Sequence, residues 1–184
     1  ISEQIQPDII FSWMAKAHLY GAVVSWMTGT PTAWYQHGLP RSATWLNRLI
    51  SLLPTAAVLA CSRTVAEAQK RRWPKHPTEV VHPCVHLDRF DPAHLPPPNV
   101  ARSELNLPTE GPLIGMVGRL QRWKGMHTLI EAMPKILKLY PKAYAVIVGG
   151  RHDLEPNYLP RLEEEILALD LSDRVLLAGF QSNV

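Results

Sequence analysis

The chain has 184 residues, of which 46% are hydrophobic and 19% are charged, and its formal net charge is +3. This composition excludes a chain that is disordered throughout, because disordered chains are poor in apolar residues and rich in charge. Two cysteines, Cys61 and Cys84, are too few for a disulfide scaffold and favour a cytoplasmic location. No apolar run approaches the roughly 20 residues that a membrane-spanning helix needs.

Short apolar runs alternate with helical patterns in the first part of the chain. This alternation predicts strands at about 8–13, 31–36 and 56–61, and helices at about 14–27, 43–53 and 63–73. Strands that are separated by helices indicate parallel pairing with crossover connections.

A proline-rich segment interrupts this alternation. Nine of the 17 prolines lie between Pro74 and Pro112, and three of them are consecutive at 96–98. Because proline fixes φ and lacks a backbone donor, such a segment is typical of an extended, semi-rigid linker. We place this linker at residues 92–111.

The same alternation resumes beyond the linker. It predicts strands at about 113–117, 144–148 and 174–178, and helices at about 126–140 and 159–169. The first of these helices carries an apolar stripe at steps of three and four, formed by Met126, Leu129, Ile130, Met133, Ile136, Leu137 and Tyr140. Pro134 lies within this stripe and is expected to bend or locally break the helix.

Both parts indicate the α/β class, with parallel-sheet, Rossmann-like domains at residues 1–91 and 112–184. Each domain has about three expected strands, fewer than the five or six of a typical sheet. We therefore expect both domains to be incomplete, as in a segment from the middle of a longer protein.

The first part has an uneven charge distribution, because no carboxylate occurs between Asp8 and Glu67. This stretch contains four basic residues and four tryptophans: Lys16, Arg41, Arg48, Arg63, Trp13, Trp26, Trp34 and Trp45. A basic surface with interleaved aromatics is typical of contact with nucleic acid, anionic lipid or a phosphorylated substrate. The simpler interpretation, which we favour, places the tryptophans in the core.

The segment from Gly118 to Gly125 is the most informative for function. Glycines at both ends allow close approach of the backbone to a ligand, and the helix that follows presents unpaired amides. Arg119 and Lys124 are spaced to bracket a diphosphate. The segment fits neither a Walker loop nor the dinucleotide fingerprint. On spacing alone, a phosphate site and an ordinary surface turn remain equal alternatives.

Several segments carry a resemblance to a known family. The sequence Gly-Met-Val-Gly-Arg-Leu-Gln-Arg-Trp-Lys-Gly at 115–125, followed by Leu-Ile-Glu-Ala at 129–132, resembles the start of the C-terminal domain of the GT-B glycosyltransferases of family 4 (glycosyl transferases group 1). Residues 80–90, 102–107 and 146–150 resemble further segments in the family's order. The resemblance departs from the family at Pro83, Cys84 and His86.

The resemblance implies the GT-B fold, in which a nucleotide-sugar binds between two Rossmann-like domains. It implies a fragment of a retaining glycosyltransferase that moves a sugar from a nucleotide-diphosphate-sugar to a hydroxyl acceptor. The carboxylate-free basic region, rather than the resemblance, suggests lipid-linked molecules and saccharides as candidate acceptors. No nucleic acid partner is expected, and the basic region suggests a peripheral contact at the inner face of the membrane. The family's pair of glutamates lies beyond the last expected strand, so we expect the isolated chain to be inactive.

The resemblance also assigns site residues. Arg119 and Lys124 correspond to the residues that bind the donor diphosphate and stabilise the charge that develops on it. Gly118 allows close backbone approach, and Gly149 and Gly150 line the nucleotide side. These cations replace a metal ion in such enzymes, and the sequence has no Asp-x-Asp, so we expect no metal and no other cofactor.

His37 completes the set of site residues from the first domain. It follows an expected strand, at the end where open α/β sheets bind ligands. The resemblance places it against the donor sugar, although an isolated histidine is more often structural. His82 and His86 do not form a helical metal-ligand pair, because Pro83 lies between them.

Two alternatives of different kinds remain. A GT-B sugar-nucleotide epimerase shares the fold, and the Lys-Gly turn at 124–125 argues against it. A noncatalytic interaction module would use the basic, tryptophan-rich region instead.

Overall fold

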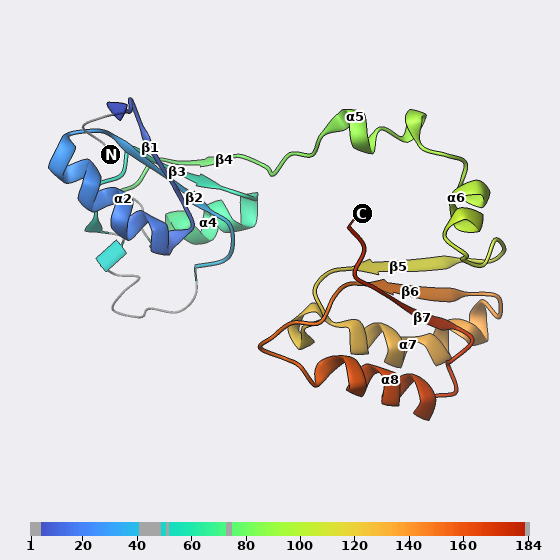
Figure 1. The fold of residues 1–184 in the computed structure, drawn as a ribbon. Coiled ribbons are helices and arrows are strands. Elements are labelled where there is room, and N and C mark those ends of the chain that lie inside the picture. Colours follow the sequence, from blue (N-terminus) through green and yellow to red (C-terminus); the bar gives the residue numbers. More distant parts are fainter. Residues whose placement is uncertain (1–4, 41–48, 51, 73–74, 183–184) are drawn as a thin grey trace. The chain divides into compact units, whose positions relative to one another are not determined.

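The computed structural model describes residues 5–40, 49–50, 52–72 and 75–182. The chain divides into two compact units, Ile1–Phe90 (unit 1) and Asp91–Val184 (unit 2). Each unit contains its own parallel β-sheet with helices as connections, as Figure 1 shows. The expected α/β class is therefore confirmed.

The sheet of unit 1 has the order β1-β2-β3-β4, and all of its pairs are parallel. Its strands are β1 (Ile10–Trp13), β2 (Thr32–Gln36), β3 (Ala57–Ala60) and β4 (Thr78–Val80), and its helices are α2 (Ala15–Thr28), α4 (Arg63–Arg72) and the short α5 (Leu87–Phe90). All five residues of β2 are buried, because β2 lies between β1 and β3. The helix expected at 43–53 falls mostly outside the described residues.

The core of unit 1 forms around Trp34 of β2. Its side chain packs with Ile50 and Val58, and the imidazole of His18 from α2 stacks on its ring at a centroid distance of 5.1 Å. The interpretation that the tryptophans are core residues is wrong for Trp13 and Trp26, whose side chains are 56% and 80% exposed. Trp45, Arg41 and Arg48 lie outside the described residues.

The sheet of unit 2 has the order β5-β6-β7 and is also parallel. Its strands are β5 (Leu113–Val117), β6 (Tyr144–Val148) and β7 (Val175–Gly179), and its helices are α7 (Met126–Leu139) and α8 (Tyr158–Ala168). Both helices lie on the same face of this sheet (Figure 1). These elements agree with the expected ones to within one residue at each boundary.

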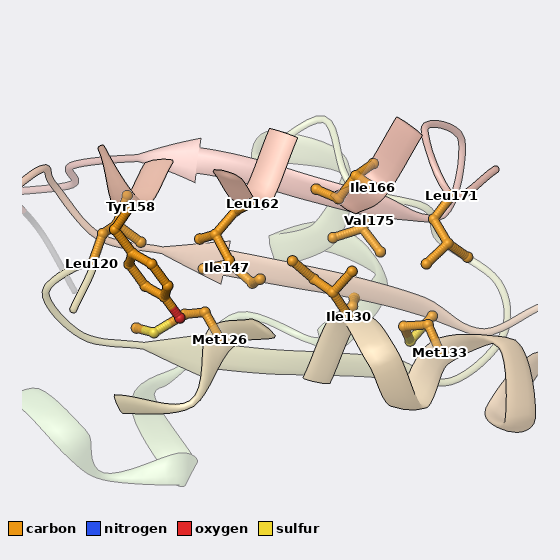
Figure 2. Close-up of a cluster of buried hydrophobic side chains, with 11 residues drawn as sticks. Leu120, Met126, Ile130, Met133, Ile147, Tyr158, Leu162, Ile166, Leu171 and Val175 are labelled. Atoms are coloured by element: carbon orange, nitrogen blue, oxygen red, sulfur yellow. The ribbon is translucent and has the colours of Figure 1, made fainter. Parts of the chain in front are cut away.

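The core of unit 2 lies between this sheet and its two helices. Figure 2 shows Ile130 and Met133 of α7 facing side chains of α8 and of the sheet, among them Leu162 of α8 and Ile147 of β6. The apolar stripe of α7 explains this contact, and Tyr140 is the exception, since its side chain is 57% exposed. The helix continues through Pro134 without a break, because buried side chains before it and the partly buried Ile136 and Leu137 after it hold both halves against the core.

Residues 92–111, the expected linker, belong to unit 2. They include a 3₁₀ turn, η1 (Pro92–His94), and the helix α6 (Pro98–Glu104). The guanidinium of Arg102 donates to the carbonyl oxygens of Pro108 at 3.3 Å and Gly111 at 2.9 Å. These hydrogen bonds attach α6 to the residues that lead into β5.

Backbone hydrogen bonds join the carboxyl ends of the three strands of unit 2. The N–H of Gly118 donates to Val148 at 2.9 Å, and the N–H of Gly149 donates to Gly179 at 2.8 Å. The two turns after β5 and β6 approach so closely that a Cβ on Gly149 would overlap the carbonyl oxygen of Gly118. Only glycine therefore fits at position 149.

Replacing Leu162 by alanine should lower the free energy of unfolding of unit 2 by about 2–5 kcal/mol, because the fully buried side chain would leave a cavity. Leu167 lies on the same helix and is 70% exposed, so Leu167→Ala should change the free energy of unfolding by less than about 0.5 kcal/mol. Urea unfolding of both variants measures the difference. Equal effects would contradict the assignment of the core.

Replacing Gly149 by alanine should destabilise unit 2 by about 1–3 kcal/mol, since the two turns would have to separate. Gly115 in β5 has no atom within 4 Å of an added Cβ and serves as the control. Urea unfolding should show full stability for Gly115→Ala. A Gly149→Ala protein as stable as the parent would refute the close approach of the turns.

Acidification should destabilise unit 1 through His18. Burial, and to a smaller extent the charge of His76, lower the pKa of His18 from 6.5 to about 4. The unfolded chain thus takes up a proton at His18 below about pH 6.5, whereas the folded chain does so only near pH 4. Stability should therefore fall by about 1 kcal/mol per pH unit between these values. Urea unfolding at pH 7, 6 and 5 measures this slope, and His18→Leu should reduce it. An unchanged slope in His18→Leu would exclude His18 as its source.

Candidate functional site

The turn between β5 and α7 presents cations on an anchored backbone. Leu120 and Met126 are buried in the core and fix the two ends of the turn, whereas Arg119 and Lys124 are exposed. The intervening residues form a 3₁₀ turn, η2 (Arg122–Lys124). Gly125 follows with a φ of 83°, in the left-handed region that glycine adopts without strain, and α7 begins at the next residue.

Most backbone amides of this turn donate to acceptors within the protein. The amide of Leu120 donates to Gly150 at 3.0 Å, and those of Lys124 and Gly125 donate to carbonyls inside the turn. The amide of His127, in the first turn of α7, donates to the hydroxyl of Tyr158 at 3.3 Å. The sequence suggested that such amides would face a ligand. They instead fix the turn, so side chains must supply much of any attraction for an anion.

Three side chains, two from the loop after β6 and one from the first residue of α8, contact this turn and the start of α7. The carboxylate of Glu155 accepts from the amide of Arg122 at 2.8 Å, and the hydroxyl of Tyr158 lies 2.8 Å from Nδ1 of His127. The third contact brings Nε2 of His152 to 3.4 Å from a guanidinium nitrogen of Arg119.

Sequence reasoning missed this loop. Its signal is a spacing of three residues, His152-x-x-Glu155-x-x-Tyr158, immediately after the glycine pair at 149–150. The contacts link residues that lie 31 or 33 positions apart, so only the pairing of β5 with β6 brings them together.

Burial raises the pKa of the Tyr158 hydroxyl, and the hydrogen bond from the backbone of His127 opposes this rise. The hydroxyl therefore stays protonated near neutral pH. It accepts from the amide of His127 and forms a second hydrogen bond with the Nδ1 of the same residue. This pair of bonds fixes the start of α7 against α8.

The two site cations differ in their surroundings. Lys124 places its ammonium 4.1 Å from the ring centroid of Trp123, a cation–π contact, and its aliphatic chain lies against Gly118. Within the part of the chain that the structure describes, neither Arg119 nor Lys124 forms an ion pair with a carboxylate.

Gly149 and Gly150 border a cavity of about 310 Å³ on the side of α8. Its walls include Leu120, Leu177 and the exposed ring of Phe180. The predicted site residues Gly118, Arg119, Lys124, Gly149 and Gly150 therefore lie together at the carboxyl ends of β5 and β6.

His37 belongs to unit 1, where it directly follows β2 and is exposed. Its ring lies 6.0 Å from that of Trp13 and 5.9 Å from that of Tyr35, and these two aromatic rings stack at 4.6 Å. The same strand ends border a mainly apolar cavity of about 600 Å³, which is lined by residues from β1, β2 and the start of α2. His37 therefore lies at a strand end that also borders a cavity.

The described residues contain neither a cluster suited to a metal ion nor a helix suited to a membrane span. Among them, no group of three or more histidine, cysteine, aspartate or glutamate residues is placed to hold a metal ion. None of the described helices has the length and apolar character needed to cross a membrane.

Known proteins resemble the chain in sequence and in structure. The D-inositol 3-phosphate glycosyltransferase of Corynebacterium jeikeium (strain K411) is 38% identical over 86 residues, which make up 46% of this chain and 20% of the relative. HepE of Anabaena in complex with UDP matches with a TM-score of 0.83 at 24% identity, over 97% of this chain and 50% of its own. A glycosyltransferase from Rickettsia africae matches with a TM-score of 0.79 at 25% identity, over 99% and 49% of the two chains.

The matched stretch thus spans about a fifth of the length of the curated relative, and the chain spans about half of each solved structure. These structural matches confirm the GT-B fold. Residues 1–89 match the family described as Glycosyltransferase Family 4, and residues 99–184 match that described as Glycosyl transferases group 1. The two matches leave out only residues 90–98, and the chain belongs to the GT-B glycosyltransferases of these families.

Proposed function

We propose that the protein moves a sugar from a nucleotide-diphosphate-sugar to a hydroxyl acceptor, and that unit 2 binds the donor. The observation that carries this proposal is the pair of exposed cations, Arg119 and Lys124, on a turn whose backbone is anchored at both ends. Fixed positive groups lose little freedom when an anion binds, and such a turn therefore suits a diphosphate.

In this reaction the bond between the sugar and the diphosphate breaks, and negative charge grows on the diphosphate. Arg119 can donate two N–H groups to its oxygens, and Lys124 adds a compact charge. Both stabilise the leaving group more strongly as its charge increases, which lowers the barrier. The proposal needs no metal ion, because the two side chains supply the positive charge.

The cavity beside Gly149 and Gly150 is the candidate binding site for the nucleoside. It adjoins the turn, has apolar walls, and carries the exposed ring of Phe180 at its border. A base can stack on such a ring. HepE, which shares the fold, was solved with UDP. By analogy, we propose that unit 2 of the present chain binds a nucleoside diphosphate.

Unit 1 would then provide the acceptor side. His37 offers a hydrogen-bonding imidazole at a strand end, and the cavity of about 600 Å³ beside it suits an acceptor with an apolar part. The exposed residues of α2 include Tyr20, Trp26 and Met27, with Lys16 at its start. Aromatic and basic groups of this kind favour a membrane surface, so we include a peripheral membrane contact in the proposal.

Binding of UDP, GDP and ADP to the 184-residue chain, measured by calorimetry, tests the donor site. Each charge-assisted hydrogen bond contributes about 1.5–3 kcal/mol, so the double variant Arg119→Ala, Lys124→Ala should weaken binding at least about a hundredfold. Lys138→Ala removes an exposed cation of α7 outside the site and should leave the affinity unchanged. A loss below about tenfold in the double variant would remove the proposed role of these cations.

A further inference from the structure

The imidazole of His152 faces a hydrogen-bond donor at each of its two nitrogens. The backbone N–H of Leu154 points at Nδ1 at 3.2 Å, and a guanidinium nitrogen of Arg119 lies 3.4 Å from Nε2. A guanidinium has only donors, and so does an amide N–H. A neutral imidazole has a single acceptor nitrogen, so it cannot accept from both neighbours.

The amide of Leu154 makes the shorter contact, 3.2 Å against 3.4 Å for Arg119, and favours the tautomer that accepts from it. It can only donate, so its hydrogen bond requires a lone pair on Nδ1, and the proton of the neutral ring is then on Nε2. In this tautomer the Nε2–H group and the N–H groups of Arg119 are both donors, so the 3.4 Å contact between them cannot act as a hydrogen bond. An imidazolium would have two donors and would lose the bond from Leu154. In either state, donors from His152 and Arg119 converge without an acceptor of their own.

We propose that His152 and Arg119 bind one oxygen of a diphosphate together, with Nε2–H and the guanidinium as its two donors. This inference rests on the proposed function and adds a binding residue to the same site. An anionic oxygen between the two side chains accepts a hydrogen bond from each, so that neither donor is left without an acceptor. The expected ligand is the diphosphate of a nucleotide.

The surrounding contacts hold His152 in place for this role. Glu155, on the same loop, and Tyr158, at the start of α8, bind the turn of Arg119 and the start of α7 through hydrogen bonds of 2.8 Å each. The amide of Leu154 fixes the ring from its other side. His152 itself is half-buried, and its partner Arg119 is exposed. The donor pair is thus formed before any ligand arrives.

Two substitutions of His152 test the roles of its two ring nitrogens separately. The side-chain amide of asparagine reaches the position of Nδ1, so His152→Asn keeps an acceptor for Leu154 and loses the donor at Nε2. Glutamine is longer, so His152→Gln places an N–H near the position of Nε2. A structural role through Leu154 would be kept best by asparagine, and a role in binding would be kept best by glutamine.

The test measures binding of UDP, GDP and inorganic pyrophosphate to the 184-residue chain by calorimetry. His152→Asn should weaken the binding of the diphosphates about tenfold or more, the loss of one charge-assisted hydrogen bond, and His152→Gln should stay within about threefold of the parent. Nitrogen-15 spectra of the imidazole should show the Nε2–H tautomer in the free chain and a shift of that nitrogen when the ligand is added. A response to pyrophosphate as well as to the nucleotides would assign the contact to the phosphates rather than to the base.

The outcomes distinguish this inference from the function on which it rests. If Arg119→Ala, Lys124→Ala weakens binding and His152→Asn does not, the role of His152 is wrong and the donor site stands. The Nδ1–H tautomer in the free chain would likewise overturn the inference alone. If the parent chain binds none of the three ligands, the donor site itself is wrong, and the inference fails with it.

Discussion

The backbone hydrogen bonds at the carboxyl ends of β5, β6 and β7 are the constraint on which the candidate site depends. Gly118 is bonded to Val148 and Gly149 to Gly179, and the absence of a side chain at Gly149 lets the first two turns touch. Because these bonds fix the ends of three strands at once, every side chain on the turns starts from a defined position. The arrangement of the cations therefore follows from the sheet itself.

The same bonds also limit what the backbone can do. Helix starts commonly bind anions through free amides, yet the amides of the turn before α7 donate mostly to protein acceptors. The attraction for an anion then comes chiefly from Arg119 and Lys124. Charged side chains at an exposed turn are screened by water and salt until a ligand or a second surface covers them. In the proposed reaction, the cations would act most strongly once the site is shielded from solvent.

The sequence predicted the strands and helices well, because each has a strong local pattern. The apolar run of β5 and the stripe of α7 are examples, and the structure departs from the stripe only at Tyr140, beyond the last residue of the helix. Trp13 and Trp26 were misplaced because a large aromatic residue at a strand end or on a helix does not by itself reveal which side faces solvent. The contacts of His152, Glu155 and Tyr158 were not predictable from local patterns, since they arise only when two strands pair across more than 30 residues.

The three-residue spacing of His152, Glu155 and Tyr158 has a consequence for related sequences. Each of these side chains meets a different partner on the facing turn, and the partners are Arg119, Arg122 and His127. An insertion or deletion of one residue between 152 and 158 would shift at least one partner out of reach, whereas a substitution at the intervening positions would leave the contacts intact. Natural variation in this loop should therefore change its residues while keeping its length, and added residues should accumulate outside it.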